Sequence, residues 1–287
     1  MKILVFGGCG FLGSYIANEL VKQNHSVTVV DIQKKYFNSK CFFKRCDITN
    51  SDEVKSVFDE TVDIVFNFAA VADLNISINE PLNTMKVNVM GNLNLLEACR
   101  VNKIKHFIYA SSVYACSEKA SFYGISKYSA EKIVEEYQKY YGLNYTILRY
   151  GSIYGPHADS SNGMFNFLKQ ALTGKILHHG TGEEVREYIH ARDAAMLSAG
   201  IVNEKKYFNK IFVLTGVEPI RQSELFKMIK EILGDKLEIK YDNQDYRGHY
   251  KYTPYSFSPS VASKLSPNPF TDLGQGIVEC LEELTRR

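Results

Sequence analysis

The chain has 287 residues, of which 45% are hydrophobic and 23% charged, and its formal net charge is +2. This composition supplies ample material for a core, and the interspersed charges exclude a broad basic surface for nucleic acid or an anionic membrane. No apolar run approaches the roughly 20 residues that cross a membrane, and the six cysteines show neither CxxC nor metal-ligand spacing. We therefore expect a cytoplasmic protein with free thiols and no metal site.

Strand-like and helix-like segments alternate from the N-terminus. The apolar runs predict strands within residues 2–8, 26–31, 41–49, 63–70, 105–112 and 144–151, and helical spacing predicts helices within 11–24, 51–60 and 92–102. Ser51 and Asp52 stand at the capping positions of the second helix. The strands are almost continuously apolar, which is typical of a parallel sheet buried on both faces. Repeated βα units of this kind predict an α/β fold with a doubly wound parallel (Rossmann) sheet.

The pattern becomes irregular after residue 151, with loops rich in Ser, Gly, Asn and His and one more β-like run at 210–216. We expect a dinucleotide-binding domain over 1–151. A smaller, discontinuous C-terminal substrate region is expected over 152–287, with segments around 187–216 returning to the Rossmann domain.

A glycine-rich stretch, GGCGFLG, joins the first expected strand to the first expected helix. It places Gly7, Gly10 and Gly13 three residues apart, and Phe11 and Leu12 open the helix. Glycine lets the backbone turn sharply and approach a pyrophosphate, whose charge then faces the N–H groups of the helix start. A tight turn that binds nothing is the simpler alternative.

Asp31 ends the second expected strand. A carboxylate at this position accepts hydrogen bonds from an adenosine ribose and repels a 2′-phosphate, so Asp31 together with the glycines predicts NAD as the cofactor. By itself, an aspartate at a strand end is a common turn residue.

Two further pairs of residues end predicted strands. Asp47 and Ile48 end the third expected strand, where an adenine edge could be met, and a simple turn is an equally good explanation for Asp47. Ala69 and Ala70 end the fourth strand, where small side chains would let a dinucleotide lie over the sheet. Close helix packing is the alternative for the two alanines.

Tyr123 and Lys127 are four residues apart at the start of a helical pattern, so their side chains share one helical face. A lysine ammonium near a phenol favours the phenolate and lowers its pKa. Such a tyrosine can remove a hydroxyl proton while NAD oxidises the same carbon, and the lysine can also bind the nicotinamide ribose.

These motifs together resemble the extended short-chain dehydrogenase/reductase family, in particular its nucleotide-sugar epimerases, dehydratases and dehydrogenases. The resemblance covers nearly the whole chain and includes the segments GGCGFLG, FNFAAVAD, VNVMGNLNLLEA, YASSVY, YGISK, LRYGSIYGP, GTGEEVREYIHARDAA and FTDLGQGIVECLEEL. It implies that Tyr123 is the acid/base and Lys127 its partner, with NAD as cofactor and a nucleotide-diphosphate sugar as substrate.

The resemblance also implies a serine that hydrogen-bonds the reacting sugar hydroxyl. The strand register points to Ser112, with Ser111 as the fallback. Asn88 resembles the family asparagine that orders the active-site end of its helix, and a surface asparagine is the alternative. We expect Ser126 and Ser129 to lie on the helix surface, and Tyr109 and Tyr114 to be packing residues.

Two arginines match the family positions that contact the pyrophosphate of the substrate. They are Arg186 and Arg247, and planar guanidinium groups suit this task because they bind phosphate through two hydrogen bonds. Surface ion pairs with Glu183, Glu184 or Asp245 are the alternative. Ser152 replaces an asparagine that holds the sugar or phosphate in many relatives.

The reaction implied by the resemblance is oxidation at C4 of the sugar, by a 4-epimerase or a 4-dehydrogenase. A 4,6-dehydratase would need an Asp and a Glu after the serine, where Val113 and Tyr114 stand. One alternative resembles the 3,5-epimerase/4-reductase that makes GDP-fucose, which uses a Cys and a His, and Cys116 and His157 are the candidates for them. A non-catalytic dinucleotide-binding sensor is another. Helices at about 88–103 and 124–142 resemble the pair that forms a four-helix homodimer interface in relatives.

Overall fold

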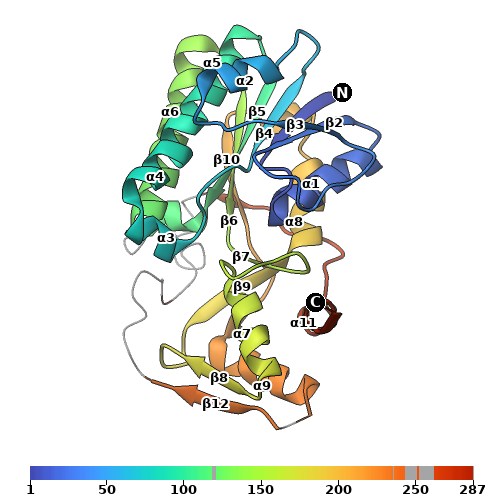
Figure 1. Ribbon diagram of the computed structural model, residues 1–287, viewed down its shortest axis with the longest axis vertical. Helices are drawn as coiled ribbons and strands as arrows, with labels where there is room; N and C mark the ends of the chain where they lie inside the picture. The colour runs from blue at the N-terminus through green and yellow to red at the C-terminus, as the bar shows by residue number, and fades with distance from the viewer. Residues whose placement is uncertain (118–120, 235, 243–250, 252–261, 287) are drawn as a thin grey trace.

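The structure is a computed structural model, and it describes residues 1–117, 121–234, 236–242, 251 and 262–286. Its largest element is a parallel sheet of eight described strands, in the upper part of Figure 1. In spatial order these strands are β13 (Ser263–Lys264), β10 (Lys210–Leu214), β6 (Tyr145–Tyr150), β5 (His106–Ser112), β4 (Ile64–Asn67), β1 (Lys2–Phe6), β2 (Ser26–Asp31) and β3 (Phe42–Arg45). The strand order reverses between β1 and β4, so the carboxyl edge there is the switch point where such sheets bind ligands.

The six strands expected from the sequence are confirmed, since β1 to β6 each lie within their predicted run. The apolar residues of the inner strands are buried, including all seven residues of β5, whereas Phe42 on the edge strand β3 is exposed. This explains why these runs are almost continuously apolar, because helices cover both faces of the sheet.

One face of the sheet is covered by α1 (Phe11–Lys22) and α8 (Ala191–Ala199), and the other by α2 (Ser51–Val57), α5 (Asn92–Val101) and α6 (Ser121–Tyr141). The expected cap of α2 is wrong: Asn50 is the N-cap, because its side-chain oxygen accepts hydrogen bonds from the N–H groups of Asp52 and Glu53. Across the described ranges, every helix is too short or too polar to span a lipid bilayer.

Several short helical segments lie beside the sheet. They are α3 (Leu74–Asn79), α4 (Pro81–Met85), the π-helical turn η1 (Lys86–Gly91), and the 3₁₀ turns η2 (Val113–Cys116) and η3 (Lys205–Tyr207). A π-helical turn is rare and is often found at functional sites. Here η1 leads directly into α5.

The lower part of Figure 1 holds a second core. Its helices are α7 (Gly163–Leu172), α9 (Gln222–Ile232) and α11 (Leu273–Arg286), and its strands are β7 (Ser152–Tyr154), β8 (Lys175–His178), β9 (Val185–His190), β11 (Pro219–Arg221) and β12 (Glu238–Tyr241). Phe167, Phe226 and Ile277 are buried between these elements. Between β9 and β11 the chain returns to the upper part of the molecule, where α8 packs on α1 and β10 pairs with β6.

Candidate active site

The glycine-rich loop joins β1 to α1 at the carboxyl edge of the sheet. Gly7 has a φ of 71°, and a Cβ added to it would lie 2.5 Å from the backbone nitrogen of Ala69. A Cβ on Gly13 would lie 2.1 Å from the carbonyl oxygen of Gly7. Neither position has room for a side chain, so the tight turn between β1 and α1 requires glycine at both. The N–H groups that open α1, beginning at Phe11 and Leu12, have no acceptor within a helix and suit an anion.

Asp31, the last residue of β2, lies beside this loop. Its Oδ2 accepts a hydrogen bond from the Cys9 N–H at 3.0 Å, and its Oδ1 accepts one from the Gln33 N–H at 3.2 Å. A carboxylate oxygen can accept more than one hydrogen bond, so the group can still receive ribose hydroxyls. The loop and Asp31 therefore fit the adenosine and pyrophosphate parts of NAD.

The other predicted dinucleotide contacts follow β3 and β4. Asp47 accepts a hydrogen bond from the N–H two residues further on, at 2.8 Å, so it forms the turn after β3. Ile48 is buried, and a Cβ on Gly91 would lie 2.6 Å from its Cδ1. Ala69 and Ala70 are half-buried directly after β4. All four stand at the same edge as the glycine loop, because parallel strands end together.

Tyr123 and Lys127 lie on the buried face of α6, next to the end of β5. The Lys127 Nζ donates a hydrogen bond to the Ala110 carbonyl at 2.7 Å and lies 6.0 Å from the centre of the Tyr123 ring. Lys127 is only 4% exposed, and this burial lowers its pKa from 10.5 to about 8, against the raising effect of the Glu131 carboxylate. The two predicted residues are thus brought together, with the ammonium beside the phenol.

Ser111 and Ser112, both buried, have different partners. The Ser111 Oγ donates a hydrogen bond to Glu131 Oε1 at 2.5 Å. The Ser112 Oγ accepts one from the Tyr114 N–H at 3.2 Å and caps η2. A serine has one hydroxyl proton to donate, so Ser111 has already committed its proton while Ser112 can still donate one.

Asn88 is a buried link between the loop after β4 and helix α6. Its side chain accepts from the Val71 N–H at 2.8 Å and donates to the Val71 carbonyl at 2.9 Å and to Ser126 Oγ at 2.9 Å. Ser126 Oγ in turn donates to the Tyr123 carbonyl at 2.7 Å. The expectation that Ser126 lies on the helix surface is wrong, because this network buries it completely. Both side-chain N–H groups of Asn88 therefore already donate hydrogen bonds within the protein.

Sequence reasoning missed two buried charged residues beneath this site. Glu131 binds Arg149 through both carboxylate oxygens, at 2.8 Å to Nε and 2.6 Å to Nη2. The available signal was the spacing, because Glu131 continues the series of Tyr123 and Lys127 by one more helical turn. Tyr109, expected to be a packing residue, is confirmed as one, since it is buried in the core under α6.

Of the predicted substrate residues, Arg186 lies on β9 and is buried. Its Nη1 donates to the carbonyls of Val185 at 2.9 Å and Lys251 at 3.3 Å. The nearby carboxylates have other partners, since Glu183 lies 3.3 Å from Arg221 and Glu184 lies 3.0 Å from His178. Ser152 begins β7 and is half-buried. Arg247 lies outside the described residues.

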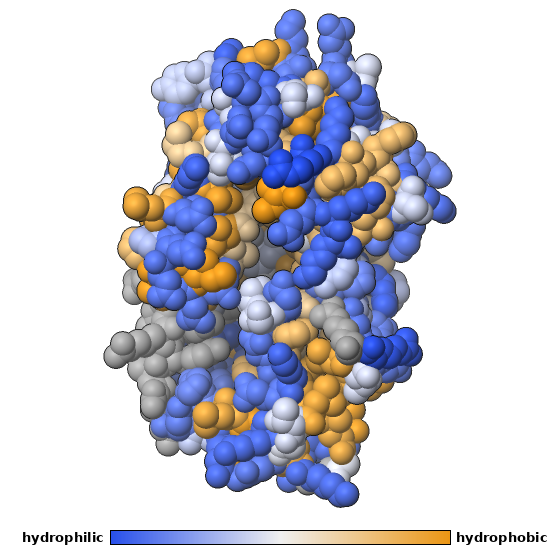
Figure 2. Space-filling view, in the orientation of Figure 1, coloured by the Kyte–Doolittle hydropathy of each residue, from blue (hydrophilic) through white to orange (hydrophobic). Residues whose placement is uncertain are grey.

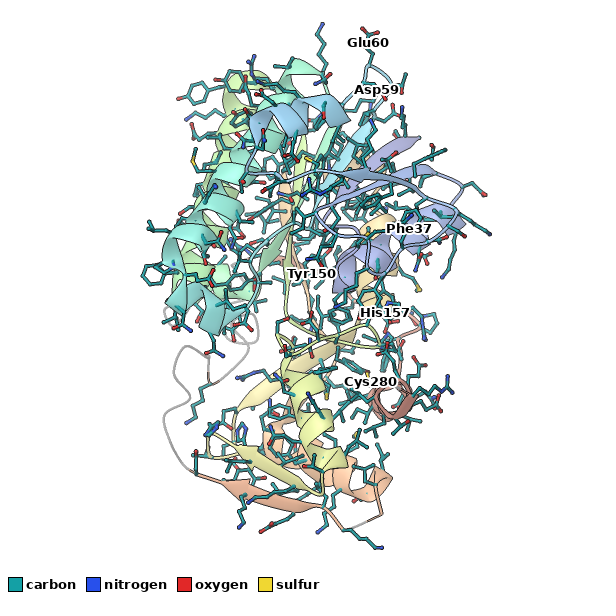
Figure 3. All side chains as sticks on the ribbon, viewed as in Figure 1. Phe37, Asp59, Glu60, Tyr150, His157 and Cys280 are labelled. Carbon is teal, nitrogen blue, oxygen red and sulfur yellow. The ribbon has the colours of Figure 1, made fainter. Side chains whose placement is uncertain are left out.

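His157 and Cys116, the candidates for a reductase-like site, have other surroundings. The His157 ring stacks on Tyr36 with centroids 4.3 Å apart and also contacts Tyr15 of α1, while the backbone N–H of His157 donates to Glu283 of α11. Figure 3 shows His157 where the upper and lower parts of the molecule meet. Burial raises the pKa of the Cys116 thiol, so it stays protonated at neutral pH.

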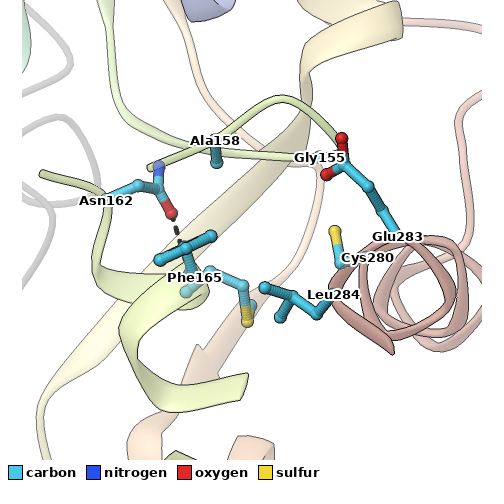
Figure 4. A pocket seen from close by; sticks show the side chains of 8 residues that line it. Gly155, Ala158, Asn162, Phe165, Cys280, Glu283 and Leu284 are labelled. Carbon is cyan, nitrogen blue, oxygen red and sulfur yellow. Dashed lines mark hydrogen bonds between the residues drawn. The ribbon is translucent and has the colours of Figure 1, made fainter. Parts of the chain in front are cut away.

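A small cavity lies between α11 and the loop that follows β7 (Figure 4). It is lined by side chains that include Asn162, Phe165, Cys280 and Glu283. Burial raises the pKa of Cys280 to about 12, so this thiol is not a nucleophile at neutral pH. None of the predicted site residues lines this cavity.

Comparisons with known proteins agree with the geometry. Residues 3–213 match the NAD dependent epimerase/dehydratase family. A putative UDP-glucose 4-epimerase of Methanocaldococcus jannaschii is 29% identical over 96% of this chain and 95% of its own length. A UDP-glucose 4-epimerase of Lactobacillus helveticus is 30% identical over 86% of each chain.

Solved structures give the same picture. The UDP-glucose 4-epimerase of Thermotoga maritima with UDP-glucose matches with a TM-score of 0.88 and 29% identity, over 100% of this chain and 99% of that one. The UDP-glucose 4-epimerase of Thermus thermophilus with NAD matches with a TM-score of 0.83 and 25% identity, over 99% of each chain. The family match covers the glycine loop, Asp31 and the Tyr123–Lys127 pair. This chain therefore belongs to the NAD-dependent epimerase/dehydratase family and is an enzyme that uses NAD.

Proposed function

We propose that this protein is a nucleotide-sugar 4-epimerase that acts on a UDP-linked hexose. The observation that carries the proposal is the meeting of Tyr123, Lys127 and Ser112 at the end of β5, on the same sheet edge as the glycine loop. The relatives named as UDP-glucose 4-epimerases support it, because they match this chain over most of its length.

The side chains divide the chemistry in a simple way. NAD, when bound, would supply reversible hydride transfer at C4 of the sugar. Tyr123 removes the proton of the C4 hydroxyl, and the Lys127 ammonium stabilises the resulting phenolate. Ser112 donates a hydrogen bond to the same sugar oxygen. After the 4-keto sugar has rotated to present its other face, Tyr123 returns the proton to the C4 oxygen, which becomes the hydroxyl of the epimer.

The residues after Ser112 argue against a dehydratase. Elimination at C5 and C6 needs another acid and another base, whereas Val113 is buried and apolar and Tyr114 packs edge-on against the Tyr123 ring. If the 4-keto sugar leaves before it is reduced again, the same residues make the enzyme a 4-dehydrogenase. The product distinguishes these outcomes, because only the dehydrogenase accumulates reduced cofactor.

Arg186 is proposed to bind the substrate pyrophosphate. It is buried on β9, and the planar five-donor guanidinium suits the bidentate binding of a phosphate group. Ser152 is proposed to contact the sugar or phosphate beside it, and Arg247 is proposed as a second phosphate contact. We place the enzyme in the cytoplasm, where its free thiols stay reduced, in the supply of nucleotide sugars for surface polysaccharide.

A homodimer is proposed through the outer side of α6 and its neighbours. Figure 2 shows hydrophobic side chains gathered on the left of the upper part, where Figure 1 places α3 and α4. Exposed apolar residues on α4, η1 and α6 include Leu82, Met90, Ile125 and Tyr128. A patch of this kind marks a surface for another protein.

The test is an incubation with NAD and a panel of UDP-, GDP- and dTDP-sugars, with products identified by NMR. We expect a UDP-sugar to equilibrate with its C4 epimer. Tyr123→Phe should slow turnover by about 10²–10⁴-fold, because the acid/base is lost. Tyr140→Phe is the matched control, since Tyr140 lies on the same helix and is exposed, and it should keep full activity.

The other outcomes of this panel are equally specific. In a parallel incubation with reduced cofactor and a 4-keto nucleotide sugar, consumption of the cofactor would favour the reductase alternative, in which His157 and Cys116 take part. Binding of NAD without turnover of any sugar would favour the sensor. Unchanged turnover in Tyr123→Phe would contradict the proposed mechanism.

A further inference from the structure

Three side chains form a ladder along the inner face of α6. Tyr123, Lys127 and Glu131 are four residues apart, so each lies one helical turn from the next. The ladder runs inward, since the exposed fractions of their surface are 9%, 4% and 0%. The last member is a carboxylate that the reaction as described above does not use.

Glu131 is held rigidly. Arg149 of β6 binds both of its oxygens, and the Ser111 hydroxyl of β5 adds a third hydrogen bond. Both partners are buried as well. A bidentate pair with a further donor is a fixed geometry, so the negative charge stays in one place.

Two hydrogen bonds join the ladder to the end of β5. Lys127 donates to the carbonyl of Ala110, and Glu131 accepts from the hydroxyl of Ser111, the next residue of β5. The Lys127 ammonium and the Glu131 carboxylate therefore contact neighbouring residues at the end of β5. Burial pulls the pKa of Lys127 down to about 8, and the Glu131 charge pulls it up. Without that charge, a larger share of Lys127 would be neutral at neutral pH.

Other charged and titratable groups face this ladder. Tyr109 of β5 lies under Lys127, with its ring centre 5.1 Å from Nζ, and burial raises its pKa far above the usual range. Further described groups that interact electrostatically with Glu131 or Arg149 include Cys116 of η2, Tyr145 of β6, and Lys132 and Glu135 of α6. Tyr109 and Cys116 are neutral at neutral pH, so Glu131 is the fixed anion one turn from Lys127.

We propose that Glu131 is a positioning residue for the Tyr123–Lys127 pair: its carboxylate, fixed by Arg149 and Ser111, keeps the Lys127 ammonium charged and seated against the end of β5. The charged ammonium is what favours the Tyr123 phenolate. The inference rests on the proposed function only in the acid–base role of that pair.

The experiment follows the charge of Lys127 directly. Protein carrying carbon-13 at the lysine Cε is titrated by NMR, and the Lys127 signal is assigned by its loss in Lys127→Arg. The variants are Glu131→Gln, which keeps the shape but removes the charge, and the pair Glu131→Gln with Arg149→Met, which removes both charges. Glu135→Gln is the matched control, because Glu135 lies one turn further on α6 and pairs with the exposed Lys132.

In Glu131→Gln we expect the titration midpoint of Lys127 to fall by about one pH unit or more, because an opposite charge is lost and Arg149 then repels the ammonium. In the double variant the fall should be smaller, since Arg149 is gone too. Glu135→Gln should leave the midpoint unchanged. If Glu131→Gln does not fold, the double variant still decides, because it leaves no unpaired Arg149 charge in the core. A midpoint in the folded variants equal to that of the wild type would overturn the proposal.

Turnover gives a second readout. The alkaline fall of kcat should move to lower pH in Glu131→Gln by the same amount as the midpoint. A purely structural role would reduce activity at every pH without moving the profile. Absence of epimerase activity in the wild type would refute the proposed function alone, since the lysine titration is measured without substrate.

Discussion

The hydroxyl groups of Ser111 and Ser112 serve different purposes in this structure, although the residues are neighbours. Ser111 donates to Glu131, and Ser112 retains its proton for a ligand. We expect Ser112→Ala to lower kcat by about 10–100-fold with little change in stability, because a hydrogen bond to the reacting oxygen is lost. Ser111→Ala should instead lower the free energy of unfolding by about 1 kcal/mol.

Each serine variant serves as the control for the other. Steady-state kinetics and urea unfolding are measured on both, and the predicted effects fall on different quantities. The assignment of Ser112 would be wrong if Ser111→Ala lost activity while Ser112→Ala kept it.

Lys127 makes stability depend on pH. Its pKa is about 8 in the folded chain and near 10.5 when unfolded, so between these values the unfolded state binds more protons. Stability from this residue therefore rises with pH through that window, and below it the buried charge is a cost. Lys127→Met should abolish turnover and yet raise the free energy of unfolding at neutral pH by about 1–2 kcal/mol.

Urea unfolding of wild type and Lys127→Met, at neutral pH and again near the unfolded pKa, checks this prediction. The gain in stability should be present at neutral pH and shrink as the pH rises. A Met variant that is less stable than wild type at neutral pH would show that burial is not the dominant effect on Lys127.

At the scale of elements, the β1–α1 junction leaves no room for a side chain at Gly13. A Cβ on Gly13 would lie 2.1 Å from the Gly7 carbonyl, and both atoms belong to the rigid turn. We expect Gly13→Ala to lower the unfolding temperature and to weaken NAD binding more than 10-fold, roughly 1.4 kcal/mol or more. Calorimetry with NAD and thermal unfolding measure both.

Gly163→Ala is the control for this prediction. Gly163 opens α7, and a Cβ there meets nothing within 4 Å. Alanine favours helix over glycine, so this variant should bind NAD normally and be as stable as wild type or more so. Equal NAD affinity in Gly13→Ala and wild type would mean that the loop is not the pyrophosphate site.

Element types and positions followed well from the sequence, and details at their ends did not. The six strands of the first half were predicted from apolar runs, because burial on both faces requires them. The π-helical turn η1 was not predicted. It contains Asn88, whose side chain bonds Val71 and Ser126, 17 and 38 residues away along the chain, and no local pattern records such contacts.

For the whole molecule, the proposed dimer gives a direct prediction. Ile125→Glu places a charge in the exposed apolar patch of α6, so the dimer should dissociate into monomers that still bind NAD. Phe42→Glu is the control, because Phe42 is equally apolar and exposed but lies on the edge strand β3. Light scattering at micromolar concentration decides, and a monomeric wild type would contradict the interface.

The sequence by itself determined the alternation of strands and helices, the glycine turn, Asp31 and the Tyr123–Lys127 pair, because each is set by local spacing and burial. The tertiary structure alone decided which serine keeps its proton, why Ser126 is buried, and where His157 packs. It also placed Arg149 on Glu131, 18 residues away along the chain. The physical reason is that these contacts depend on which strands become neighbours in the sheet, and that order is fixed only when the whole chain packs.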